Sequence, residues 1–286
     1  MKWRGRRGSA NIEDRRGRRG GGGVALGGAG GLGLLAVVAI GWFLGIDLTP
    51  LLRDGAIQVG QPQGGGEITE ADQQAAEFVS VTLADTEEVW DGIFREQVGE
   101  LYQPATLVLF KGVTQSPCGG ASGATGPFYC PADEKAYLDT AFFTTLSQRL
   151  GASGDFAAAY VVAHEIAHHV QNELGILGQA NRIRAQSSQE QANAISVRIE
   201  LQADCLSGIW ARAAQEQFGS LERGDVEEAM NAAASIGDDT LQRGAGQVPR
   251  PESFTHGTSE QRQRWFAAGF DSGRIADCDT FSAERL

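Results

Sequence analysis

The chain has 286 residues, of which 42% are hydrophobic, and a formal net charge of −12. This length and composition suffice for one or two domains with a buried core. The charge is uneven: eight basic residues stand against two acidic ones before residue 47, a net +6, which leaves −18 for the remainder. Binding of nucleic acid phosphates requires concentrated Lys and Arg. The strongly acidic part of the chain after residue 46 therefore argues against nucleic acid as a partner.

A stretch without charged side chains follows the basic N-terminus, from Val24 to Ile46. Its 23 residues, at ~1.5 Å of rise each, are long enough to cross a hydrocarbon layer of about 30 Å. We expect a basic cytoplasmic arm over 1–23 and one transmembrane helix over 24–46, with all that follows outside the cytoplasm by the positive-inside rule. The alternative is a cleaved signal peptide, whose apolar core runs over only about 7–15 residues.

The rest divides into a flexible stalk over 47–66, rich in Gln, Pro and Gly, and one extracytoplasmic domain over 67–286. In the domain, Thr69 is a candidate N-cap of a first helix. The segment ATLVLFK (105–111) is predicted to be a strand, and 114–127 a loop. Short strands over 128–130 and 136–139 are expected to pair as a hairpin.

Further helices are expected over about 155–174, 186–218, 225–236 and 258–269. Asp155 is the expected cap of the first of these, and Gly175 its stop. Thr258 and Gln261 have the spacing of a capping box at the start of the last.

All four cysteines follow the apolar stretch, an even number in a compartment that permits disulfides. Four cysteines allow three connectivities. Cys118 with Cys130 would close a short Gly-rich loop, leaving Cys205 to tie a helix to the C-terminal tail at Cys278. A four-cysteine zinc site is disfavoured because no C-x-x-C pair occurs.

The helix over 155–174 carries the segment His164-Glu165-Ile166-Ala167-His168. Residues four apart lie on one helix face, so His164 and His168 can present two imidazoles to one Zn²⁺ ion. Zinc lowers the pKa of a bound water to about 7, and Glu165 beside the first ligand can take that water's proton. Three of the chain's four histidines fall within six residues of this apolar helix, which argues against two chance surface histidines. We expect His169, a quarter-turn away, either to support a ligand from behind or to serve in packing, and not to bind the metal.

A catalytic zinc ion usually takes three protein ligands. Gln171 and Leu174 occupy the positions where the metzincin motif requires Gly and His, which excludes that class. The third ligand is therefore His256 or an acid, and Glu200 is the best acid because its surroundings are apolar. Asp204, one turn further along, can accept the second N–H of a ligand histidine.

His256 stands just before the last helix. Besides binding the metal, it can donate a hydrogen bond to the oxyanion of a tetrahedral intermediate. A structural role at a helix start is equally compatible with this position.

The segments AHEIAHHVQ, ELQADCLSGIWA, SFTHGTSEQRQRWFAAGF and CGGASGATGPFYCPADEKAYLD together resemble the bacterial neutral zinc metallopeptidases of the YpfJ type. The resemblance implies a gluzincin-like site, with His164, His168 and Glu200 on Zn²⁺ and Glu165 as the base. The fold expected is a mostly helical α+β, zincin-like metallopeptidase domain with a small β-sheet or hairpin packed on the active-site helix, preceded by one transmembrane helix.

The resulting hypothesis is a membrane-anchored hydrolase of peptide bonds, bound to the cell membrane by its N-terminal helix, with a peptide or protein as substrate. An edge strand within 128–143 is expected to hold an extended peptide through main-chain hydrogen bonds. The alternatives are a non-catalytic exported zinc-binding or partner-binding module, and a zinc hydrolase of a non-peptide bond. The sequence specifies neither a particular substrate nor an oligomeric state.

Overall fold

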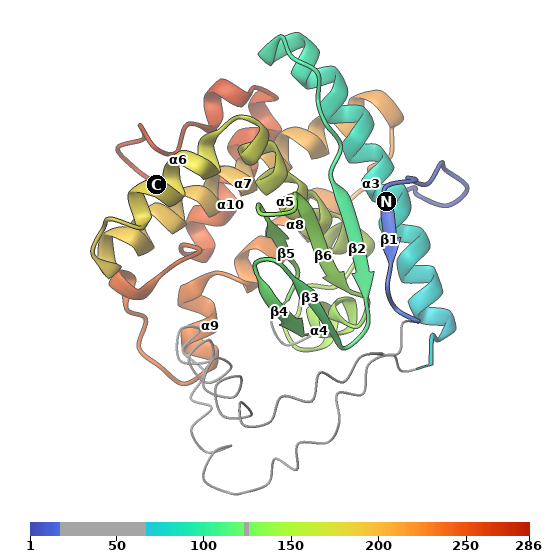
Figure 1. Cartoon of the computed structure of the whole chain (residues 1–286), viewed down its shortest axis with the longest axis horizontal. Helices are drawn as coiled ribbons and strands as arrows, with labels where there is room; N and C mark the ends of the chain where they lie inside the picture. The colour runs from blue at the N-terminus through green and yellow to red at the C-terminus, as the bar shows by residue number, and fades with distance from the viewer. Residues whose placement is uncertain (18–66, 123–125) are drawn as a thin grey trace, which may run out of the picture.

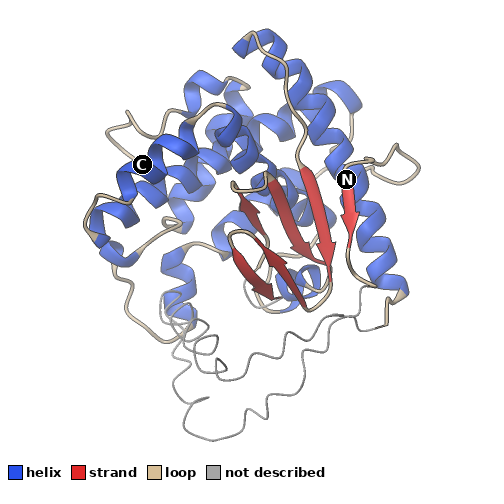
Figure 2. Cartoon of the chain, in the orientation of Figure 1, coloured by secondary structure: helices blue, strands red, loops and turns tan. Residues whose placement is uncertain are grey.

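The structure is a computed structural model that describes residues 1–17, 67–122 and 126–286. These residues form a mostly helical α+β fold around a small mixed sheet (Figures 1 and 2). The α-helices are α3 (Glu70–Ile93), α4 (Phe142–Gln148), α5 (Asp155–Glu173), α6 (Ile176–Arg184), α7 (Gln189–Phe218), α8 (Asp225–Ser235), α9 (Asp238–Gly244) and α10 (Ser259–Ser272). Shorter helical turns are the π-helix η1 (Phe94–Val98) and the 3₁₀ turns η2 (Pro251–Ser253) and η3 (Ile275–Cys278).

The main sheet has the strand order β1-β2-β6-β5, with bounds β1 (Ile12–Asp14), β2 (Thr106–Phe110), β5 (Phe128–Cys130) and β6 (Lys135–Asp139). Strands β1, β2 and β6 are parallel, whereas β5 runs antiparallel to β6, with Phe128 opposite Tyr137. A separate hairpin joins β3 (Val113–Ser116) to β4 (Gly119–Ser122). Helix α5 lies behind the sheet in the view of Figure 1.

Alternation along β2 divides the apolar side chains between the two faces of the sheet. Leu107 and Leu109 enter the main core, which also contains most of the apolar side chains of α5. Val108 and Phe110 join a smaller cluster with Cys130 and Tyr137 on the other face. Burial on both faces explains why β2 reads as a continuous apolar run.

The first 17 residues are part of this fold. Strand β1 pairs in parallel with β2, with Ile12 opposite Leu107. The Trp3 ring meets Phe78 edge-on at 5.4 Å between centroids, and Arg6 Nη1 lies 2.6 Å from Asp85 Oδ2. The predicted basic arm thus includes a strand that its sequence pattern did not indicate.

Most of the predicted elements are confirmed. Thr69 caps α3 in a capping box with Asp72, and Thr258 caps α10 with Gln261. The strand at 105–111 and the hairpin of β5 with β6 are present. The two disulfides are Cys118–Cys130 and Cys205–Cys278, the pairing in which the first closes a short loop.

Several local predictions were wrong. The expected loop at 114–127 contains most of the β3–β4 hairpin, and helices α6 and α9 were not predicted. Asp155 does not cap α5, because the N-cap position is Gly154 and the Phe156 N–H donates instead to Glu228, 72 residues away. Such long-range capping leaves no local sequence signal.

The predicted transmembrane helix (24–46) and stalk (47–66) lie outside the described residues and stay predictions. Among the helices that the structure describes, none is both long and apolar enough to cross a bilayer.

Helices α7 and α10 cross at two glycines. A Cβ built on Gly208 would lie 2.1 Å from the Phe266 carbonyl oxygen, and one on Gly269 would lie 1.8 Å from the Cys205 carbonyl oxygen. Both distances are far below van der Waals contact with backbone atoms, which cannot move aside as a side chain can. The two helices therefore approach this closely only because both positions lack a side chain.

We expect Gly269→Ala to lower the free energy of unfolding by about 3 kcal/mol, because the added methyl group forces α7 and α10 apart. The measurement is urea unfolding followed by circular dichroism. Gly244→Ala, at the end of α9, is the matched control because nothing lies within 4 Å of its built Cβ. Equal destabilisation by both substitutions would contradict the close-packing account.

Candidate metal centre

Three donor groups meet between α5 and α7. His164 Nε2 lies 3.0 Å from Glu200 Oε2, and His168 Nε2 lies 3.5 Å from Glu200 Oε1. One donor atom from each of the three residues lies within 4.8 Å of the others. The one-turn spacing on α5 stacks the histidines, whose ring centroids are 4.8 Å apart.

The other nitrogen of each imidazole faces an oxygen away from this meeting point. His164 Nδ1 lies 3.0 Å from Asp204 Oδ1, and His168 Nδ1 lies 2.9 Å from Gln171 Oε1. Protons on the Nδ1 atoms leave the Nε2 lone pairs free to point at a shared cation, as in histidine–metal sites with an oxygen behind the ring. Two imidazole nitrogens and one carboxylate form a donor set that suits Zn²⁺.

Asp204 is completely buried, and its charge is balanced within the protein. Arg262 donates to both of its oxygens, from Nε to Oδ2 at 2.8 Å and from Nη2 to Oδ1 at 2.9 Å, and Tyr160 donates to Oδ1. Burial by itself would raise the pKa of Asp204, but the Arg262 guanidinium and His164 hold it below the usual value. Asp204 is therefore an anion behind His164.

The remaining carboxylates of the site differ in their electrostatics. Burial raises the pKa of Glu165, partly opposed by the nearby His168 and His164. Burial would also raise the pKa of Glu200. Attraction to His168 and His256 and hydrogen bonds with His164 and His168 instead hold this pKa well below its usual range. The lowered pKa of Glu200 suits a carboxylate that faces a cation, whereas the raised pKa of Glu165 suits a group that takes up a proton.

His256 faces the same cavity and is fixed by Asp238, the first residue of α9. Asp238 Oδ2 accepts from the backbone N–H groups of Thr255, His256 and Gly257, at 2.7, 2.6 and 3.0 Å, and Oδ1 lies 3.3 Å from His256 Nδ1. Burial opposes protonation of His256, but Glu200 and Asp238 raise its pKa above the usual value. Sequence reasoning missed Asp238, because it did not predict α9.

A cavity of about 460 Å³ connects these groups. Its wall includes the five residues predicted to bind metal or act in catalysis, His164, Glu165, His168, Glu200 and His256. The predicted support residue Asp204 lies behind His164 instead, whereas Arg262 and Tyr160 reach the wall. Phe128 and Tyr129 of β5 also line this cavity, so the antiparallel edge strand of the sheet borders the same space as the donor groups.

His169 is turned away from the donors and buried. Its Nε2 lies 2.6 Å from the Gln103 carbonyl oxygen and its Nδ1 lies 3.0 Å from Tyr129 Oη. A carbonyl only accepts, so Nε2 carries the proton and Nδ1 accepts from the tyrosine hydroxyl. His169 thereby links α5 to β5. Two further acids of the same helices, Glu173 on α5 and Glu190 on α7, are not among the residues that line this cavity.

Comparison with known proteins agrees with this geometry. The chain matches the family described as "Putative neutral zinc metallopeptidase" over residues 1–281. It is 47% identical to the uncharacterized protein YpfJ of Escherichia coli K12, over 98% of this chain and 99% of that protein. It is 43% identical to the uncharacterized proteins Mb2605 of Mycobacterium bovis and Rv2575 of Mycobacterium tuberculosis, over 74% of each chain. No solved structure matches it. The chain belongs to the neutral zinc metallopeptidase family that includes YpfJ.

Proposed function

We propose that this protein is a zinc-dependent peptidase in which His164, His168 and Glu200 hold Zn²⁺ and Glu165 is the general base. One observation carries the proposal. Two Nε2 atoms and a carboxylate converge within 4.8 Å of one another, in a cavity whose wall also contains the buried Glu165 carboxylate. A site that only stabilised the fold would have no use for a fourth, proton-accepting group beside the donors.

When bound, Zn²⁺ supplies Lewis acidity, which polarises a carbonyl group and makes a water molecule easier to deprotonate. Glu165 takes the proton of the attacking water and delivers it to the leaving amine, a double role to which its raised pKa is suited. His256 donates a hydrogen bond to the oxygen that becomes negative in the tetrahedral intermediate. Asp238 keeps the His256 ring turned toward that oxygen.

The substrate's main chain is proposed to pair with β5. In the part of the sheet that the structure describes, β5 pairs with β6 on one side only, and Phe128 and Tyr129 border the cavity. An extended peptide that adds to a sheet edge gains main-chain hydrogen bonds irrespective of its sequence. This geometry supports a peptide as substrate over a compact non-peptide ester or amide.

We expect Glu165→Gln to retain Zn²⁺ and to lose about 10²- to 10⁴-fold in the rate of peptide cleavage, because the amide keeps the shape but cannot accept the proton. The measurement combines metal content with cleavage of a diverse peptide library by the zinc-loaded full-length protein. Wild-type protein that binds zinc and cleaves no peptide would contradict the peptidase proposal and favour the binding-module alternative.

Removal of the third donor should act on metal binding itself. We expect Glu200→Gln to weaken Zn²⁺ affinity by more than about 100-fold, measured by competition with a chelator. Glu190→Gln is the matched control, because Glu190 lies exposed in the first turn of the same helix. Equal affinity of the two variants, or a larger loss in His256→Ala, would exclude Glu200 as the ligand.

For His256→Gln we expect a fall in kcat of about 10²- to 10³-fold with little change in zinc content, the size typical of losing one oxyanion donor. Asp238→Asn should lower kcat less, because the backbone N–H groups still find an acceptor. Steady-state kinetics on one good peptide substrate gives both values. A rise in KM at unchanged kcat would assign His256 to ground-state binding instead.

A further inference from the structure

The second ligand, His168, is held by a chain of two side-chain amides. Gln171, one turn ahead on α5, places Oε1 2.9 Å from His168 Nδ1. Its Nε2 donates to the Ile199 carbonyl oxygen at 2.8 Å and to Gln202 Oε1 at 3.0 Å. Both glutamines are buried, and α7 carries Ile199 and Gln202 just before and after Glu200.

These contacts fix which atom carries each proton. The Ile199 carbonyl oxygen only accepts, so the NH₂ group of Gln171 must face it, and Oε1 must face His168. His168 Nδ1 therefore donates, and the neutral ring keeps its lone pair on Nε2, the atom turned toward Glu200. The amide of Gln171 thus selects the tautomer of His168 that can bind a metal.

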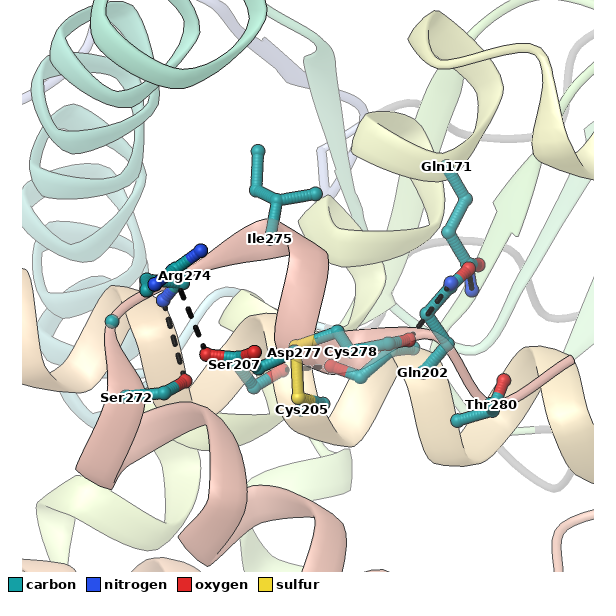
Figure 3. Close-up of a disulfide and its surroundings, with 12 residues drawn as sticks. Gln171, Gln202, Cys205, Ser207, Ser272, Arg274, Ile275, Asp277, Cys278 and Thr280 are labelled. Atoms are coloured by element: carbon teal, nitrogen blue, oxygen red, sulfur yellow. Dashed lines mark hydrogen bonds and ion pairs between the residues drawn. A yellow bond between two sulfur atoms is a disulfide. The ribbon is translucent and has the colours of Figure 1, made fainter. Parts of the chain in front are cut away.

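The series of amide hydrogen bonds continues to the C-terminal segment (Figure 3). Gln202 Nε2 donates to the Cys278 carbonyl oxygen at 3.0 Å, which turns Gln202 Oε1 toward Gln171. The Cys278 backbone is attached to α7 by the Cys205–Cys278 disulfide, one turn beyond Gln202, with 5.6 Å between the Cα atoms. Both cysteines are completely buried. The Cys278 carbonyl oxygen is thus held near α7 by a covalent bond, and it also accepts the Thr280 N–H at 2.9 Å.

We propose that Gln171 and Gln202 are positioning residues for His168, and that the Cys205–Cys278 disulfide acts on the metal site through them. Reduction by a dithiol, which supplies two electrons and two protons, converts the bond into two thiols and leaves the Cys278 carbonyl oxygen held by hydrogen bonds alone. Gln202 and Gln171 then lose their fixed orientation, and zinc affinity falls. This inference rests on the proposed zinc site and not on peptide cleavage.

The rest of the C-terminal segment remains attached after reduction. Thr280 Oγ1 donates to the Arg198 carbonyl oxygen at 2.7 Å, and Gln97 Nε2 donates to the Gly273 carbonyl oxygen at 2.9 Å. Because these contacts do not involve the cysteines, loss of the disulfide is expected to change the local position of Cys278 and to leave the fold in place.

The test is a double-mutant cycle on zinc affinity, measured by chelator competition with full-length protein well below its unfolding temperature. We expect Gln171→Met to weaken binding 10- to 100-fold, and the Cys205→Ser/Cys278→Ser variant to weaken it by a smaller factor. Both changes act through the same series of hydrogen bonds. Removing the disulfide from Gln171→Met should therefore change zinc affinity almost no further. Cys118→Ser/Cys130→Ser, which removes the other disulfide, should leave affinity unchanged.

Additive effects in the cycle would overturn the proposal, as would wild-type affinity in Gln171→Met. Gln202→Met keeps both cysteines and tests the middle of the chain if the cysteine variant does not fold. Its affinity should fall, and a value equal to wild type would also refute the proposal. Since the readout is metal binding, a protein that binds zinc without cleaving peptides would refute the peptidase proposal alone.

A separate observation concerns the N-terminal segment. The chain leaves the described structure at Gly17 and returns at Glu67, and these two points are adjacent: a Cβ built on Gly17 would lie 3.7 Å from Ile68 Cδ1. Arg16 Nη1 donates to the Asp72 carbonyl oxygen close by. Further back, Ser9 donates its N–H to the Ser80 carbonyl oxygen at 2.9 Å.

We infer that residues 1–17 and 67–286 lie on the same side of any membrane to which the protein is attached. Strand pairing of β1 with β2 and the buried contact of Trp3 with Phe78 require direct contact, which a hydrocarbon layer of about 30 Å would prevent. This inference differs from the placement expected from the sequence, with the arm in the cytoplasm and the domain outside, and the experiment below distinguishes the two.

Two single-cysteine reporters test this topology. Arg7→Cys marks the arm, where the Arg7 side chain is 64% exposed, and Val248→Cys marks the domain, at a position 81% exposed. All four native cysteines are in disulfides, so each variant carries one free thiol. Intact cells that express the full-length chain are treated with a membrane-impermeant maleimide, and lysed cells show that each thiol reacts. We expect both reporters to be labelled, or both to be protected; labelling of only one in intact cells would overturn the inference.

Discussion

Asp204 is an anion with no access to water, and the arrangement of the metal centre depends on how it is neutralised. Arg262 from α10 binds both of its oxygens, Tyr160 from α5 adds a hydroxyl, and His164 approaches from the metal side. Replacing Arg262 would leave the charge of Asp204 uncompensated in the interior, which typically costs several kcal/mol. Three helices, α5, α7 and α10, are therefore tied together by one ion pair behind the first ligand. The close crossing of α7 and α10 at Gly208 and Gly269 brings Arg262 within reach.

The two ligand histidines are supported in different ways. Behind His164 stands a charged group, Asp204, whereas behind His168 stands a neutral amide, Gln171. Burial alone would lower the pKa of the His164 imidazole. The carboxylates of Asp204 and Glu200 act against this and raise the pKa to about 9 when no cation is bound. The amide selects a tautomer without adding charge. Together the two supports aim both Nε2 atoms at one point and leave Glu200 as the anion that balances the cation.

Much of the helical framework could be predicted from local signals. Thr69 and Thr258 were correctly identified as caps, Thr258 from its capping-box spacing to Gln261 and Thr69 as a threonine at the start of a helical pattern. The hairpin of β5 with β6 was also visible as two short strands around a turn. The cap of α5 was predicted wrongly, since the acceptor that satisfies Phe156 comes from Glu228 on α8. Strand β1 escaped prediction because a three-residue edge strand next to so many arginines carries no alternation to detect.

The sequence alone determined that His164 and His168 share one face of a helix with Glu165 beside them, because the helical repeat fixes neighbours one turn apart. It narrowed the third donor to His256 or an acid and favoured Glu200 by its apolar surroundings. Only the tertiary structure decided that Glu200 meets the two histidines, that Asp238 orients His256, and that Gln171 and Gln202 reach Cys278. These contacts join residues up to 76 positions apart, and their geometry follows from how α5, α7, α9 and the C-terminal segment pack, which no local pattern encodes.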